Sequence, residues 1–176
     1  MNQKGFTLIE LLATITILSM IMLVAVPNIM SALDKSKRRT YVEDAKKMLT
    51  LAEYKYRANT TIESPSGNNA IIFPLSSMDL TDFSDGPEGG TYDIQNSYVI
   101  MISNNNTYEY YATLVEKYGD ADNYKYRGIS LKSRDDLLME EAVNDVTEFS
   151  TAPTVPTLNQ TVNINDTEYT VNNVYN

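Results

Sequence analysis

Residues 4–26 of the chain, KGFTLIELLATITILSMIMLVAV, contain the features that decide the fold. Between Phe6 and Leu33 the only charged residue is Glu10, and the apolar stretch 6–26 is 21 residues long. As a helix, such a stretch spans ~30 Å, which is the thickness of the hydrocarbon core of a bilayer. A secretory signal peptide has a shorter apolar region, of about 7–15 residues. The stretch therefore predicts a membrane-spanning helix.

Glu10 is the unusual residue of this helix. A carboxylate at the centre of a spanning helix costs roughly 2.5–3.5 kcal/mol on insertion scales, so it normally has a partner and a function. The alternative is a position near the helix end, within reach of headgroup water, where Glu10 has no role. The apolar stretch offers no cation to neutralise the carboxylate, so we expect the partner to come from elsewhere.

The residues in front of the stretch suggest what that partner is. A short basic leader ends in Lys4-Gly5 and is followed by Phe6, three further residues and Glu10. This arrangement resembles the class III signal of type IV prepilins with a short, type IVa-like leader. Pro27 also falls where many pilins carry a proline within their long helix. The resemblance covers about the first thirty residues.

The resemblance implies specific roles for these residues. Prepilin peptidase would remove the leader 1–5 by cutting between Gly5 and Phe6, and would N-methylate the new terminal Phe6. Glu10 would pair with the terminal amine of an adjacent subunit during filament assembly. Pro27, which removes one helical hydrogen bond, predicts a kink or local unwinding of the helix, with a mild bend as the alternative.

The helical pattern continues beyond the membrane segment. Apolar residues recur at spacings of three, four and seven from Tyr41 to Tyr56, which predicts one helix over about 6–58. Four parts follow: a leader 1–5, a transmembrane or filament-core half 6–33, an amphipathic half 34–58, and a globular head 59–176. We expect an α+β pilin fold in which an antiparallel sheet packs on the second half of the helix.

Within the head, two hairpins are predicted. A three-residue loop at 104–106 would pair Ile102 with Tyr108, and the turn Asn165-Asp166 would place Val162 opposite Tyr169. Tyr124–Arg127 is predicted to be a further strand. Between the hairpins, Ser133 is expected to cap a helix over about 134–149, with Leu138, Ala142 and Phe149 turned inward.

The segment 66–97 is predicted to be a long surface connection because Ser, Asp, Gly and Pro dominate it. Asp79, Asp82, Asp85 and Glu88 suggest calcium, but their spacing does not fit the ligand pattern of an EF-hand loop. A solvated acidic loop is therefore favoured.

Composition excludes most enzyme classes. The 176 residues contain no Cys and no His, which removes thiol nucleophiles, imidazole bases and the usual zinc ligands. No catalytic constellation, metal or cofactor is predicted. The net charge of −9 disfavours nucleic-acid binding, and it divides unevenly: residues 1–58 carry +4 and residues 59–176 carry −13.

The leading hypothesis is a structural subunit of a type IV pilus, for adhesion, motility or surface attachment. Its partners would be other copies of itself, other pilins, prepilin peptidase and the assembly platform. Before assembly the chain would cross the cytoplasmic membrane once, with its head outside. The alternatives are a pseudopilin of a type II secretion or competence system, and a single-pass anchored binding protein. Many Gram-negative pilins close their carboxyl-terminal loop with a disulfide. This chain contains no Cys, which favours a Gram-positive source.

Overall fold

The computed structural model describes residues 7–78, 81, 83–104 and 107–175. It divides into two compact units, Met1–Ser36 and Lys37–Asn176. Helix α1 (Leu8–Ala58) begins in the first unit and ends in the second, so the predicted long helix is confirmed. It runs through Pro27 as continuous α-helix; a kink at this residue stays a prediction.

The first unit consists of α1 up to Ser36. Its residues are exposed apart from the half-buried Ala25 and Asp34. The helix is long and apolar enough to cross a membrane, with a mean hydropathy of 2.4 over its most apolar window. A helix that is apolar on every side belongs in lipid or in the interior of a helical bundle.

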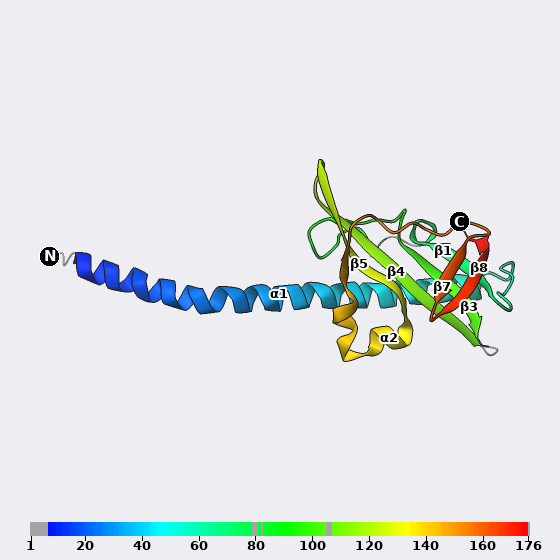
Figure 1. Ribbon diagram of the computed structural model, residues 1–176, viewed down its shortest axis with the longest axis horizontal. Helices are drawn as coiled ribbons and strands as arrows, with labels where there is room; N and C mark the ends of the chain where they lie inside the picture. The colour runs from blue at the N-terminus through cyan, green and yellow to red at the C-terminus, as the bar shows by residue number, and fades with distance from the viewer. Residues whose placement is uncertain (1–6, 79–80, 82, 105–106, 176) are drawn as a thin grey trace. The chain divides into compact units, whose positions relative to one another are not determined.

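In the second unit, the rest of α1 packs on an eight-stranded sheet (Figure 1). The strands are ordered β6-β5-β4-β3-β1-β8-β7, and β2 pairs with β4. Only the β1–β8 pair is parallel among the described strands, so the sheet is mainly antiparallel. The strands are β1 (Asn69–Pro74), β2 (Thr91–Tyr92), β3 (Tyr98–Asn104), β4 (Thr107–Asp120), β5 (Asn123–Ser133), β6 (Thr147–Phe149), β7 (Thr161–Ile164) and β8 (Thr167–Val174). The predicted α+β architecture is confirmed.

The core between helix and sheet follows from the apolar stripe of α1. Tyr41, Ala45, Met48 and Leu49 are fully buried in this stripe. They pack with the side chains that the strands present to the helix, namely Ile71, Phe73, Val99, Met101, Ala112, Leu114 and Ile129. A second cluster, which includes Ile72, Ile100, Tyr111 and Val171, fills the opposite face of the sheet. Burial of both faces explains why β1 and β3 are apolar without alternation.

The segment 66–97 was predicted to be a surface connection, and this was wrong for its first part, which contains a strand. Residues 69–74 form β1, a central strand that pairs antiparallel with β3 and parallel with β8. A six-residue strand with apolar residues on both faces has no alternating pattern, so the polar residues around it concealed it. The C-terminal strand β8 is held by this pairing.

The register of the β3–β4 hairpin was also wrong by one residue. Ile102 pairs with Glu109 rather than Tyr108, and Asn104 pairs with Thr107. A slip of one residue moves every side chain of a strand to the other face. Ala112 therefore packs toward α1, whereas Tyr111 packs in the cluster on the opposite face.

The predicted β7–β8 hairpin is confirmed, with Val162 opposite Tyr169. Asn165 and Asp166 have φ values of 50° and 62°, which is the conformation that a two-residue type I′ turn requires. The polar side chains of Asn and Asp tolerate this left-handed region better than most residues do.

The predicted helix 134–149 is shorter and divided. Ser133 caps α2 (Arg134–Leu138) in a capping box with Asp136, and a 3₁₀ helix η2 (Glu140–Asp145) follows. The chain then enters strand β6. Ala142 is buried as predicted, but Leu138 is exposed and its neighbour Leu137 is buried instead. A second short 3₁₀ helix, η1 (Leu75–Ser77), follows β1.

Candidate assembly site

Gly5 and Phe6, the predicted cleavage and methylation residues, lie outside the described residues. Their roles stay predictions. The described part begins at Thr7, which immediately precedes α1.

Glu10 and Thr7 form a reciprocal cap at the start of α1. The backbone N–H and the hydroxyl of Thr7 each donate to Glu10 Oε2 at 2.8 Å. In return the backbone N–H of Glu10 donates to Thr7 Oγ1 at 3.3 Å. This is the capping box, in which Thr at the N-cap and Glu three residues later satisfy the free N–H groups of the first turn.

The cap directs the Glu10 carboxylate back toward the start of the chain. The other carboxylate oxygen, Oε1, accepts no hydrogen bond within the described part of the chain. It therefore has acceptor capacity for a cation arriving from outside the subunit. The negative charge is also favourably placed at the N-terminal end of the helix dipole.

Sequence reasoning missed the role of Thr7. We expected no partner for Glu10 within the apolar stretch, yet Thr7 supplies two hydrogen bonds, although it adds no positive charge. The pattern Thr-x-x-Glu before an apolar run is the signature that would have indicated it.

Four other polar side chains of the apolar segment donate hydrogen bonds inside the helix. The hydroxyls of Thr14, Thr16 and Ser19 donate to backbone carbonyls three or four residues earlier, at 2.7–2.8 Å. The Asn28 amide donates to the Val24 carbonyl at 3.1 Å. A helix in hydrocarbon must satisfy its polar groups internally, so these residues are compatible with a membrane.

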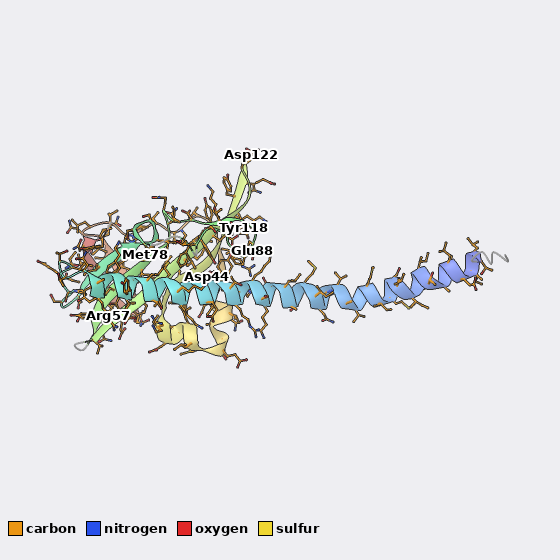
Figure 2. The ribbon with its side chains drawn as sticks, turned by 180° about the vertical axis from the view of Figure 1, so that it is seen from behind. Asp44, Arg57, Met78, Glu88, Tyr118 and Asp122 are labelled. Carbon is orange, nitrogen blue, oxygen red and sulfur yellow. The ribbon has the colours of Figure 1, made fainter. Side chains whose placement is uncertain are left out.

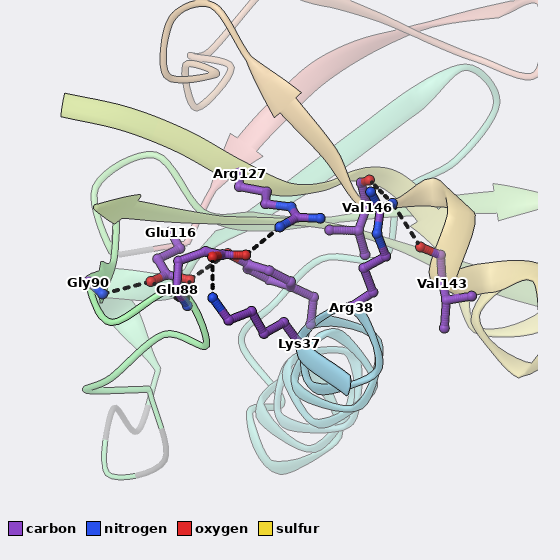
Figure 3. Close-up of polar contacts among 9 residues, drawn as sticks. Lys37, Arg38, Glu88, Gly90, Glu116, Arg127, Val143 and Val146 are labelled. Atoms are coloured by element: carbon purple, nitrogen blue, oxygen red, sulfur yellow. Dashed lines mark hydrogen bonds and ion pairs between the residues drawn. The ribbon is translucent and has the colours of Figure 1, made fainter. Parts of the chain in front are cut away.

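In the second unit, a polar cluster fixes the loop 86–90 to the sheet and to α1 (Figure 3). The fully buried carboxylate of Glu116 on β4 accepts from the Tyr41 hydroxyl. It also accepts from the backbone N–H groups of Glu88, at 3.0 Å, and Gly90, at 2.8 Å. A buried carboxylate is stable when donors surround it in this way.

Glu88 joins two elements in the same cluster. Its carboxylate pairs with Lys37 on α1, at 2.7 Å, and with Arg127 on β5. Glu88 was predicted to belong to a solvated acidic loop, and this was wrong because both cations come from elements distant in sequence. Asp79 and Asp82, from the same prediction, lie outside the described residues. Within the described part, no group of three His, Cys, Asp or Glu side chains forms a candidate metal site.

Two further contacts hold α1 in place. Arg38 donates to the carbonyl oxygens of Val143, at 3.3 Å, and Val146, at 2.8 Å, beside η2. The Asp44 carboxylate accepts from Tyr92, at 2.6 Å, and pairs with Lys47 at 2.8 Å. Together, the contacts of Glu116, Glu88, Arg38 and Asp44 fix α1 and the loop 86–90 to the sheet. We name this cluster the polar clamp, and its role is structural.

Tyr41, Tyr92 and Tyr110, which pack in the core between α1 and the sheet, predict a loss of stability in alkali. Burial, reinforced by Glu116 and Asp44 respectively, raises the pKa of Tyr41 and Tyr92, and burial raises the pKa of Tyr110 to about 12. Above about pH 10 the unfolded chain loses these protons while the folded chain retains them, so the free energy of unfolding falls as pH rises. Each retained proton contributes up to about 1.4 kcal/mol per pH unit.

Scanning calorimetry of the full chain in detergent, between about pH 9 and about pH 11, measures this slope. The variant Tyr41→Phe/Tyr92→Phe should show a shallower fall. An equally steep fall in that variant would assign the alkaline effect to other groups. Tyr124→Phe, which alters an exposed ring on the β4–β5 hairpin, is the control.

Comparison with known proteins identifies the N-terminal segment. No curated protein and no solved structure matches the chain significantly. Residues 1–26 match the family model of the prokaryotic N-terminal methylation motif, which ends just before Pro27. The chain therefore carries the class III signal of type IV pilins at the start of a long apolar helix.

Proposed function

We propose that this chain is a structural subunit of a type IV pilus, processed by prepilin peptidase and polymerised through its apolar helix. The observation that carries the proposal is Glu10, which Thr7 caps and whose Oε1 accepts no hydrogen bond within the described residues, in the segment that matches the methylation motif. A motif for N-terminal processing followed by a spanning helix suits a membrane-anchored precursor.

The proposal gives the exposed apolar helix two successive environments. Before assembly, lipid covers the side chains from Leu8 to Leu33, and the head lies outside the cytoplasmic membrane. After cleavage, the terminal amine of Phe6 on one subunit neutralises Glu10 of a neighbour, so the carboxylate can leave headgroup water for a bundle of helices. An ion pair with satisfied hydrogen bonds offsets part of the cost of burying each charge.

Immunogold electron microscopy with antibodies to the head tests the proposal. We expect gold along surface fibres, which would identify a major subunit of the pilus. Sparse or terminal labelling of fibres would identify a minor subunit. Labelling confined to the membrane would contradict polymerisation and favour an anchored binding protein.

A further inference from the structure

The end of α1 borders an open apolar groove in the second unit. The groove has a volume of about 490 Å³ and lies between the helix and the residues after β1. Leu51, Tyr54, Ala58 and Met78 supply its carbon surface. Tyr54 is 72% exposed, the largest exposure of any large apolar residue among the described residues of this unit. A rigid aromatic ring exposed beside an apolar hollow is typical of an interface.

The helix surface around this groove exposes more positive than negative side chains, although Lys47 pairs with Asp44, at 2.8 Å, and Arg57 pairs with Glu53, at 2.6 Å, within the subunit. Lys47 lies one turn before Leu51 on the same side of the helix, and Lys55 lines the groove itself. Arg57 is also exposed near the helix end, whereas Glu43 is the one exposed carboxylate within 37–58. A partner for this surface should therefore carry an apolar projection with negative charges around it.

The segment of α2 and η2 has those properties. Leu138 and Met139, at its centre, are 66% and 61% exposed. Three exposed carboxylates surround them, from Asp135, Glu140 and Glu141. We name this surface, residues 135–141, the acidic knob. Its carboxylates would be repelled by an anionic lipid surface, so it does not suit a membrane.

The acidic knob is held rigidly. Leu137 and Ala142 anchor it in the core beneath the exposed pair. On either side, Arg38 binds the carbonyl oxygens after it, and Arg134 contacts Thr50 and Glu53 of α1. A rigid projection loses little conformational entropy on docking, which favours binding.

We propose that the acidic knob of one subunit docks into the Tyr54 groove of the next copy of this chain. Leu138 and Met139 enter the groove, and the carboxylates of Glu140 and Glu141 face the cations beside it. Both surfaces are exposed within one subunit, so they do not satisfy each other there. The proposal rests on the polymerisation proposed above and names a contact between the head of one subunit and the amphipathic half of α1 in the next.

The geometry of such a contact accounts for an extended assembly. The two surfaces differ, so the contact is heterologous: each subunit offers a knob to one neighbour and a groove to another. A heterologous contact that does not close into a ring generates an open helical filament. The uneven charge of the chain, +4 over 1–58 and −13 over 59–176, favours the same pairing of a head with the helix of a neighbour.

Cysteine cross-linking tests the contact directly, because the native chain contains no Cys. Filaments are prepared from Tyr54→Cys/Met139→Cys and from Ala58→Cys/Leu138→Cys, and are treated with a short bismaleimide. Each subunit then joins two neighbours, so we expect a ladder of dimers, trimers and longer species on denaturing gels. Single-cysteine variants cannot exceed dimers.

Tyr54→Cys/Asp122→Cys is the matched control. Figure 2 shows Asp122 at the tip of the β4–β5 hairpin, far from Arg57 and Met78 near the groove. Intact filaments in which neither knob–groove pair extends beyond dimers would overturn the docking proposal while leaving polymerisation intact. A wild-type chain that forms no filament would instead overturn the proposed function.

Charge reversal provides a second test that needs no cross-linker. Glu140→Lys/Glu141→Lys should lower the yield of sheared filaments several-fold, and adding Arg57→Glu should restore part of it. Asp120→Lys/Asp122→Lys makes the same charge change on the distant hairpin and should have little effect. Equal losses in the knob and hairpin variants, without recovery, would contradict the contact.

Discussion

Replacing Glu10 with alanine is expected to leave cleavage between Gly5 and Phe6 intact and to reduce surface filaments at least tenfold. The carboxylate is the group that the neighbouring terminal amine would bind, and its Oε1 has no internal donor in the described part of the chain. The variant therefore lacks the pairing that would hold each incoming subunit in the filament.

The measurement is the ratio of sheared filament to membrane-bound subunit on immunoblots. A loss of about 1.4 kcal/mol per docking step already gives a tenfold change in the equilibrium. Glu63→Ala, which removes an exposed carboxylate from the head, is the matched control and should assemble normally. A normal filament yield from the Glu10 variant would contradict the proposed pairing of Glu10 with a terminal amine.

Replacing Glu116 with alanine is expected to destabilise the second unit by about 3 kcal/mol, the largest effect that we expect from a single change in the head. Its carboxylate accepts from Tyr41 and from the backbone N–H groups of Glu88 and Gly90. Removing it leaves these buried donors without their acceptor. It also frees the loop 86–90, so the pairing of Glu88 with Lys37 and Arg127 should weaken.

Urea unfolding of the full chain in detergent, followed by near-ultraviolet circular dichroism of the tyrosines, measures this effect. Glu116→Gln should recover only part of the loss, because one of the two acceptor oxygens becomes an NH2 donor that faces donors. Glu168→Ala, on an exposed position of β8, is the control and should change the free energy of unfolding by less than about 0.5 kcal/mol. An equally small change at Glu116 would show that the polar clamp contributes no stability.

The sequence predicted those parts of the fold that depend on local signals. The apolar run and the heptad-like stripe predicted α1, Ser133 predicted the start of α2, and Asn165-Asp166 predicted the β7–β8 turn. In each case a few adjacent residues specify the conformation through periodicity, capping or φ preference.

Features that depend on distant neighbours were missed. Strand β1 exists because β3 and β8 flank it, and the β3–β4 register depends on what covers each face of the sheet. Strand β3 is buried on both faces, so the sequence pattern accepts either register. A strand pattern fixes register only where one face is apolar and the other polar.

In the candidate site, too, the residues with local signals were identified from the sequence, and those that depend on distant partners were not. Glu10 was identified because a carboxylate in an apolar run is locally anomalous, and the Thr7 cap was identifiable from its spacing. Glu88 was misassigned because its partners, Lys37 and Arg127, lie 51 and 39 residues away in the chain. Sequence spacing alone contains no information on such a pair.

The mass of the subunit isolated from cells tests the central claim most directly. Intact-protein mass spectrometry of sheared filaments should give a chain that begins at Phe6 and carries one additional methyl group at its amine. A strain expressing Gly5→Trp should give no sheared filaments, and its membranes should contain only the precursor with its leader. Finding the wild-type chain only in the membrane, unmethylated and still beginning at Met1, would contradict the account.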